Sequence, residues 1–340
     1  NRLKQGDHYE ESFNNDVQLK DGSIYTIQFS GEDLAGNVAI NVSVENMTFD
    51  TSPPVIVINE PTANGFYNQV MLDYELNETL VSGKIILERR GGANDPMSPH
   101  EIALSNDQLL PGKKSDFLIN THTNLISNTT YNIRIEGQDM AGNMGKSLEI
   151  AGVTFDDIPP DISVTSPAPD SYINETILGL RTNEVLSEAK IEWIWVDGNP
   201  DPAGPHESKM IGDQLQDGDY PEVKFDPPPT LISSARYRVV YTGTDRAGNT
   251  STYTLGTLFF DNEPPEISML FPIENGFTNA NEVSYELNEP LLMANLIWTS
   301  IDGAETISID LTGDELKPGI FTQATLANQS ELSDGTVYNL

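Results

Sequence analysis

The sequence contains no cysteine, and this absence excludes disulfide bonds, thiolate metal sites and a cysteine nucleophile. Basic residues are also scarce, because 18 Lys and Arg stand against 52 Asp and Glu for a formal charge of −34. So negative a chain repels polyanions, and we expect it to bind no nucleic acid. No apolar run approaches the roughly 18 residues that span a bilayer, so we expect no direct membrane insertion in this segment.

Motifs of catalysis are missing as well. The sequence has no Gly-x-Ser-x-Gly elbow, no phosphate-binding glycine loop and no His-Glu-x-x-His. Acidic residues are plentiful, but many recur at the same position of a repeat, whereas a hydrolase places its pair of carboxylates once, in a cleft. We therefore predict that the chain is not an enzyme.

What the sequence does have is a long internal repeat. The motif Gly-x-Asp-x-Ala-Gly-Asn occurs at 31–37, 137–143 and 243–249, at intervals of 106 residues, and Phe-Asp-x-x-Pro-Pro recurs at nearly the same spacing. This period matches one small autonomous domain rather than a solenoid turn. We predict the C-terminal half of a repeat, two whole repeats and the N-terminal part of another, which makes the chain an expected excerpt of a longer protein. The predicted boundaries are 1–52, 53–158, 159–263 and 264–340.

Apolar and polar residues alternate within each repeat, as in the stretch from Tyr131 to Glu136, and this period of two indicates half-buried strands. No helical pattern exceeds a turn or two, and Gly, Pro, Asn and Asp punctuate the strands. The pattern predicts an all-β fold in which tandem Greek-key, immunoglobulin-like β-sandwich domains of about seven strands each are joined end to end. Trp193 and Trp298 hold matching positions in one strand, and we expect them in the core.

A leucine lies six residues before a tyrosine that opens a strand in every repeat. The four pairs are Leu19 and Tyr25, Leu125 and Tyr131, Leu231 and Tyr237, and Leu332 and Tyr338. This resembles the tyrosine corner of immunoglobulin-like and fibronectin type III sandwiches, in which the Tyr hydroxyl bonds back to the preceding backbone. With the hairpin and boundary motifs, the chain resembles the tandem immunoglobulin-like repeats of large bacterial surface and secreted proteins. That resemblance implies an extracellular setting and a role as an adhesin stalk, an envelope layer or a spacer.

Acidic residues recur where such a fold would bring two domains together. In an immunoglobulin-like sandwich the loop after the second strand and the hairpin before the last strand lie at the end that receives the linker. Crowded carboxylates without His or Cys favour calcium, which would stiffen the joint. The alternative is local, with the hairpin Asp accepting N–H bonds across a turn that needs glycine. The predicted ligands are Asp50, Glu78 and Asp139 at the first joint, Asp156, Glu184 and Asp245 at the second, and Asp261 and Glu289 at the third.

Other repeated features leave several functions open. Asp95 and His100, echoed by Asp201 and His206, lie in a long loop that is shorter in the last repeat, and we interpret it as a tolerated surface insertion or a contact surface.

We predict a non-enzymatic stalk or filament whose partners are neighbouring copies, other surface proteins or glycans. One alternative is a surface layer or sheath lattice. Another is a spacer or carbohydrate-binding module of a secreted enzyme. The candidate sugar-stacking side chains are Trp193, Trp195 and Trp298, and the candidate glycosylation triplets begin at Asn41, Asn46, Asn77, Asn128, Asn174, Asn249 and Asn328.

Overall fold

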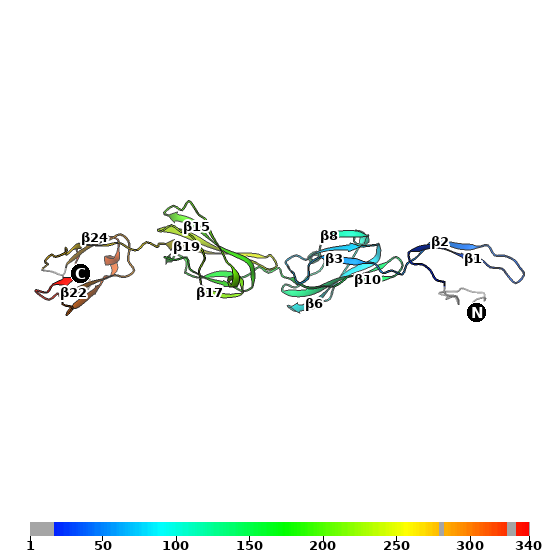
Figure 1. The fold of residues 1–340 in the computed structure, drawn as a ribbon, viewed down its shortest axis with the longest axis horizontal. Helices are drawn as coiled ribbons and strands as arrows, with labels where there is room; N and C mark the ends of the chain where they lie inside the picture. The colour runs from blue at the N-terminus through cyan, green and yellow to red at the C-terminus, as the bar shows by residue number, and fades with distance from the viewer. Residues whose placement is uncertain (1–16, 279–281, 325–330, 340) are drawn as a thin grey trace.

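A computed structural model describes residues 17–278, 282–324 and 331–339. The chain forms a row of four units that follow one another in sequence order along the long axis (Figure 1). The first unit is a single antiparallel hairpin of β1 (Ser23–Phe29) and β2 (Val42–Phe49). In the part of the chain that the structure describes, no helix is long and apolar enough to cross a membrane.

The second unit, the first complete module, is a sandwich of two sheets. The smaller sheet has the order β3 (Ile56–Glu60), β5 (Met71–Leu76), β8 (Gly112–Leu118). The larger has the order β4 (Phe66–Tyr67), β11 (Ile150–Phe155), β9 (Thr129–Asp139), β6 (Leu80–Gly92), β7 (His100–Ala103), and β10 (Met144–Lys146) also pairs with β9. Only single turns of 3-10 helix interrupt the strands, at Asn106–Leu109 and Ile119–Thr121.

The third unit, the second complete module, repeats this topology, with the single strand Thr250–Phe260 in the place of β10 and β11. Its sheets are β12 (Ile162–Ser166), β14 (Leu178–Thr182), β17 (Gly218–Val223), and β13 (Tyr172–Ile173), β19 (Thr250–Phe260), β18 (Ala235–Asp245), β15 (Leu186–Gly198), β16 (His206–Lys209). A 3-10 turn at Gly212–Leu215 precedes β17. A three-stranded sheet packed on a four-stranded one, with a short strand added in parallel beside the last strand, is the immunoglobulin-like arrangement. The predicted fold class is confirmed.

The fourth unit contains the front part of the same module. One sheet has the order β20 (Ile267–Phe271), β21 (Val283–Leu287), β24 (Gly319–Ala324), and the other has the order β23 (Thr306–Asp310), β22 (Asn295–Ser300), β25 (Tyr338–Asn339). A 3-10 turn at Gly313–Leu316 precedes β24, as the turns at Asn106–Leu109 and Gly212–Leu215 precede β8 and β17. The repetition of this turn confirms that the units share one local plan.

Each of the last three units has its own hydrophobic core. In β9 every second residue is buried, as the alternation predicts, and Ile133 is fully buried. Trp193 occupies the core of the second complete module at 0% exposure, and Trp298 the matching place in the next unit at 3%. Burial of a large apolar side chain contributes roughly 1.5–3 kcal/mol, so separate cores let each module be stable by itself. The exact domain boundaries stay predictions.

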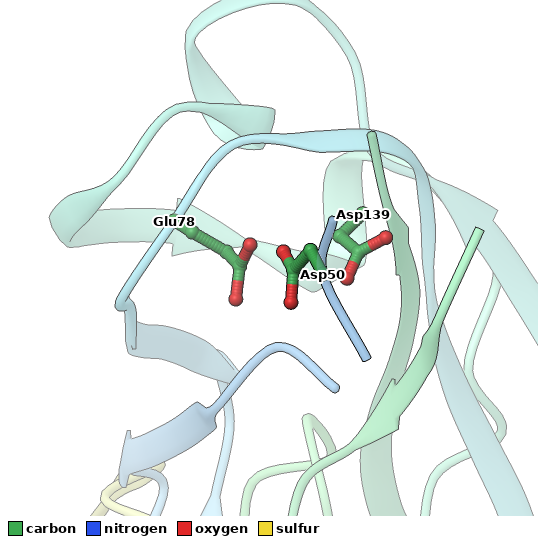
Figure 2. A group of neighbouring side chains, drawn as sticks. All are labelled: Asp50, Glu78 and Asp139. Carbon is green, nitrogen blue, oxygen red and sulfur yellow. The ribbon is translucent and has the colours of Figure 1, made fainter. Parts of the chain in front are cut away.

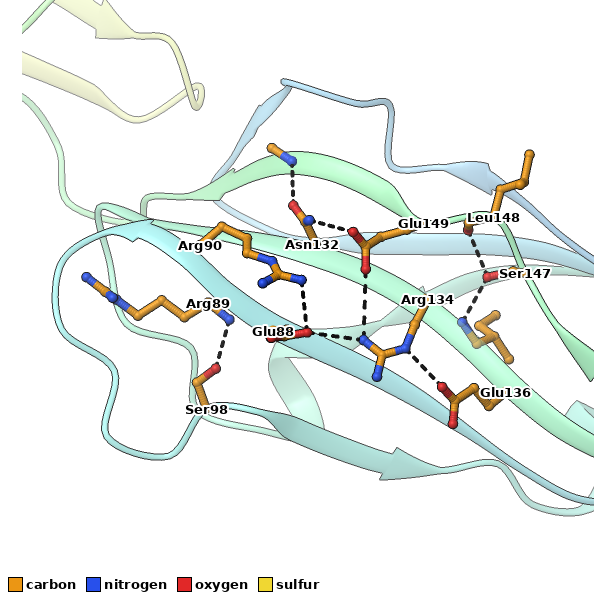
Figure 3. A network of polar contacts seen from close by, with 12 residues as sticks. Glu88, Arg89, Arg90, Ser98, Asn132, Arg134, Glu136, Ser147, Leu148 and Glu149 are labelled. Carbon is orange, nitrogen blue, oxygen red and sulfur yellow. Dashed lines mark hydrogen bonds and ion pairs between the residues drawn. The ribbon is translucent and has the colours of Figure 1, made fainter.

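The outer face of the larger sheet carries a polar network in the first complete module (Figure 3). The guanidinium of Arg134 on β9 lies 3.0 Å from Glu136 and 3.4 Å from Glu88 on β6, and 3.9 Å from Glu149. Its hydrogen bond to Glu136 and the surrounding carboxylates raise the pKa of Arg134. The network connects neighbouring strands on the side of the sheet away from the core. Because these side chains are only partly buried, their ion pairs contribute little to the stability of the module.

Candidate metal centres at the joints between modules

The hairpin motif has a local structure that explains most of its residues. Oδ1 of Asp139 accepts hydrogen bonds from the backbone N–H groups of Ala141 and Asn143, at 2.8 and 2.9 Å, and Oδ2 accepts from Nδ2 of Asn143 at 2.8 Å. Gly142 has a φ of 96°, which side chains with a Cβ rarely adopt. The same Asp to Asn bonds recur at 33–37 and 245–249. The local interpretation of the motif is therefore confirmed.

The asparagine that ends the motif also reaches outside its hairpin. Nδ2 of Asn143 donates to the backbone oxygen of Asp50 at 3.2 Å, and Nδ2 of Asn249 donates to that of Asp156 at 2.8 Å. Asp50 and Asp156 lie in the linkers that enter the two complete modules, so each hairpin holds the incoming linker. This role was not predicted from the sequence, although the asparagine holds the same place in all three motifs.

The preceding module holds the same linker from its other side. Oγ of Ser127, in the tyrosine corner of the first complete module, donates to Oδ1 of Asp156 at 2.7 Å and accepts from the backbone N–H of Asp157 at 2.9 Å. In the first unit Asp21 takes this place and accepts hydrogen bonds from Thr51 and Ser52. The linker is thus bonded to both of the modules that it joins, and its path is defined.

The glutamate of each predicted triplet is positioned by the asparagine before it. Oδ1 of Asn77 accepts the backbone N–H of Val55, the first residue after the Pro-Pro pair, at 2.8 Å. Asn183 and Asn288 bond to the corresponding residues after the next two Pro-Pro pairs, both at 2.8 Å. This bond brings the Asn-Glu turn beside the linker, so that the glutamate side chain faces the joint.

The structure brings six of the eight predicted ligands together as two triplets. At the first joint Asp50, Glu78 and Asp139 converge (Figure 2), and one carboxylate oxygen from each lies within 4.8 Å of the others. At the second joint the same limit holds for the equivalent triplet of Asp156, Glu184 and Asp245. The hairpin aspartates are the most deeply covered, because Asp139 and Asp245 are each 1% exposed.

The third joint contains the two acids predicted there. Burial and the charge of Asp261, followed by a hydrogen bond between the two side chains and the charge of Glu263, raise the pKa of Glu289. Asp261 and Glu289 therefore lie close enough to repel each other when both are ionised.

Like charges crowd each triplet. Burial together with the negative charges of Asp156 and Asp245 raises the pKa of Glu184 to about 7. For Asp139, burial alone would raise the pKa, but the hydrogen bonds from Asn143 and the turn outweigh it and lower the pKa. Hydrogen bonds therefore favour the ionised form of Asp139 at the first joint, and like charges disfavour the ionised form of Glu184 at the second. Three carboxylates without nitrogen or sulfur donors are a ligand set suited to a hard cation, and calcium prefers such oxygens.

The structure corrects the interpretation of the loop that contains Asp95 and His100. These side chains are not surface residues, since Asp95 is 5% and His100 6% exposed. Oδ2 of Asp95 lies 2.6 Å from Nε2 of His100 and accepts a hydrogen bond from the hydroxyl of Tyr131 at 2.5 Å. Asp201, His206 and Tyr237 repeat the arrangement in the next module. The loop is attached to the tyrosine corner, because its Asp accepts the hydrogen bond of the buried Tyr hydroxyl and its His bonds in turn to that Asp.

The tyrosine corner itself is as predicted. In all four units the Tyr hydroxyl accepts the backbone N–H of the residue five positions earlier, which is Lys20, Ile126, Ile232 or Ser333.

The tryptophans argue against a carbohydrate platform. Trp193 and Trp298 are buried in the cores, and the indole N–H of the partly exposed Trp195 donates to the backbone oxygen of Asn199. A sugar could not stack on the buried rings without opening the module.

No protein-family model and no curated protein matches the chain. Solved structures do match. They include a tetra-tandem repeat in the extending region of a large adhesion protein, with 17% identity over 91% of this chain and 74% of that one and a TM-score of 0.30. A 1.5-MDa bacterial ice-binding adhesin matches with 15% identity over 81% of this chain and 88% of that one, at a TM-score of 0.28.

The fibronectin type III-like modules of CbhA from Clostridium thermocellum match with 11% identity over 61% of this chain and 94% of that one, at a TM-score of 0.28. These are the kinds of repeat that the sequence resembles. The strand order of the two complete modules shows the same fold class independently.

Proposed function

We propose that this chain is a non-enzymatic structural segment of a long extracellular surface protein. It would serve as a stalk or filament of rigidly linked immunoglobulin-like modules that holds another element away from the cell. The observation that carries the proposal is the double attachment of the linker. Asn249 of one module and Ser127 of the other both bond to the linker at Asp156 and Asp157. A joint that is held from both sides resists bending, and the Pro-Pro pair restricts it further.

Calcium at the joints is the second part of the proposal. An ion among Asp50, Glu78 and Asp139, and another among Asp156, Glu184 and Asp245, would remove the repulsion within each triplet and connect the linker to two loops of the following module. Asp261 and Glu289 would contribute to a third site. The proximity of the carboxylates and the absence of other donor types in the triplets support calcium over a transition metal.

The surface fits an extended extracellular role. A charge of −34 keeps long chains apart and soluble, and it disfavours nucleic acid as a partner. The partners that we propose are neighbouring copies of the chain, other surface proteins and glycans.

Distances between labelled modules would test the proposal. Because the chain has no cysteine, spin labels can be attached to cysteines introduced at Lys113 on β8 and Asp219 on β17, two exposed and equivalent positions on either side of the second joint. We expect one narrow distance distribution in calcium and a broader one in a chelator, with a maximum dimension from X-ray scattering that corresponds to an extended row.

Each part of the proposal can fail separately. A broad distribution both with and without calcium would contradict a rigid stalk. A narrow distribution that is identical in calcium and in chelator would retain the stalk and remove the metal from it.

A further inference from the structure

The second joint contains a contact that uses neither the linker nor the acidic triplet. The guanidinium carbon of Arg246, at the tip of the hairpin of the second complete module, lies 5.3 Å from the ring centroid of Phe66 in the first complete module. One residue after Arg246 and two residues after Phe66, the backbone N–H of Asn68 donates to the carbonyl of Ala247 at 3.3 Å. Two segments that are about 180 residues apart therefore meet directly across the joint.

The geometry suits an attraction between a cation and an aromatic face. A guanidinium within about 6 Å of a ring centroid is attracted by the electron density of the ring, and arginine is the side chain most often found there. Phe66 is 39% exposed, so its ring is open to such a partner. It lies in β4, which pairs in parallel with β11, and this pairing fixes the ring beside the start of the outgoing linker.

We propose that Phe66 and Asn68 form a docking surface for the hairpin tip of the following module, occupied by Arg246 and Ala247, and that this contact sets the angle of the joint without a metal ion. The inference rests on the proposed function, since it concerns the same rigid row of modules. It assigns the hairpin motif two separate tasks. The Asp and Asn of the motif hold the turn and the linker. The residue between Asp and Ala, which differs among the three motifs, determines which surface of the preceding module the hairpin contacts.

The second complete module presents the matching surface. Tyr172 and Asn174 occupy the places of Phe66 and Asn68, and the backbone oxygen of Ile173 accepts the N–H of Asp261 as that of Tyr67 accepts the N–H of Asp156. The Tyr172 ring is 73% exposed and stacks on Phe259, with ring centroids 4.7 Å apart. Tyr172, Asn174 and Glu175 line a groove of about 360 Å³ at this end of the module. An aromatic ring beside a groove is therefore available to the hairpin of a following module.

The test uses the full chain with the spin-label pair at positions 113 and 219, measured in chelator so that no bound cation contributes. We expect Arg246→Ala and Phe66→Leu each to broaden the distance distribution, and the double variant to broaden it no further than either one, because both remove the same contact. Arg238→Ala is the matched control, since it removes an exposed arginine from the same module away from the joint. This control should leave the distribution unchanged.

The outcomes separate this inference from the proposed function. An unchanged distribution in Arg246→Ala and Phe66→Leu overturns the docking surface, and so does a wild-type distribution in chelator that is already as broad as that of the variants. A wild-type distribution that is broad in calcium and in chelator contradicts the rigid stalk itself. A narrow wild-type distribution in both solutions that broadens in the variants supports the docking surface and removes calcium from the joint.

Discussion

Nδ2 of Asn249 donates a hydrogen bond to the backbone oxygen of Asp156, a residue 93 positions earlier in the chain, over 2.8 Å. This bond connects a hairpin of the second complete module to the linker that enters it. The equivalent bond from Asn143 to Asp50 spans the same number of residues. Because the same contact is present at both joints, it is part of the connection between modules.

Removing this amide should loosen the second joint. We expect Asn249→Ala to broaden the distance distribution between labels at positions 113 and 219 and to cost the second complete module about 1 kcal/mol, the typical value of one hydrogen bond. The control is Asn37→Ala, which changes the same motif position in the first unit and bonds to Asp33. The prediction is wrong if the two variants affect the second joint equally.

The buried tyrosine hydroxyl should be a major source of stability in the second complete module. Tyr237 is fully buried, accepts the N–H of Ile232 at 2.9 Å and donates to Asp201 at 2.7 Å. Tyr237→Phe leaves Asp201 with one partner fewer, and we expect a loss of about 1–3 kcal/mol. Denaturant unfolding followed by the fluorescence of Trp193 and Trp195, both in this module, in a Trp298→Phe background would measure it. Tyr172→Phe, at an exposed ring, should change the unfolding free energy little.

The stability that Asp201 provides should depend on pH. Burial alone would raise the pKa of Asp201, but hydrogen bonds from Tyr237 and His206 and the positive charge of His206 lower it below 3.8. An acid whose pKa is lower in the folded state stabilises the fold above its unfolded pKa, and this contribution disappears as the pH falls through the folded value. We expect the difference in unfolding free energy between wild type and Asp201→Asn to be largest near neutral pH. It should shrink below about pH 4, and a constant difference would contradict the prediction.

Calcium should raise the melting temperature of the wild-type chain. An ion at one hundred times its dissociation constant adds about 2.7 kcal/mol to the folded state. In Glu184→Gln we expect a smaller calcium effect and, in chelator, a melting temperature at or above that of wild type, because the amide no longer repels Asp156 and Asp245. Glu188→Gln, at an exposed position of the following strand, β15, should respond to calcium as wild type does. Equal calcium responses in all three proteins would exclude Glu184 as a ligand.

The buried tryptophan should act as a core residue. We expect Trp193→Ala to destabilise the second complete module by about 3–5 kcal/mol, because it removes a side chain that is 0% exposed. Trp195→Ala should cost far less, since that side chain is 39% exposed. Thermal unfolding followed by circular dichroism distinguishes the two. Similar losses would mean that the core is not organised around Trp193.

The sequence allowed much of the fold to be predicted, because local patterns encode it. Neighbouring residues carry these patterns, as in the alternation around Ile133 and Ile135 and in the leucine before each corner tyrosine. Because each pattern recurs in the repeats, its assignment is less ambiguous than it would be in a single copy. The triplet of Asp50, Glu78 and Asp139 could be predicted to meet because the topology of the sandwich brings those loops to one end. Its role as a metal site stays a prediction.

Other parts of the site could not be predicted, because their partners are distant in sequence and carry no local pattern. The bond between Tyr131 and Asp95 joins residues 36 positions apart, and the loop that contains Asp95 differed in length between repeats, which suggested a dispensable insertion. In the last unit the hydroxyl of Tyr338 bonds instead to Glu305. The corner hydroxyl thus donates to a carboxylate in this unit too, although Tyr338 is only partly buried and the acceptor is a different residue.

The parallel pairing of β4 with β11, and of β13 with β19, has a mechanical consequence. The backbone bonds from Thr154 to Gly65 and from Asp156 to Tyr67 join a segment near the start of one module to its final strand. Tension that pulls the two ends of a module apart acts along these strands, so it shears the bonds simultaneously instead of opening them one after another. A tether built in this way would withstand drag from flowing liquid until several bonds break together.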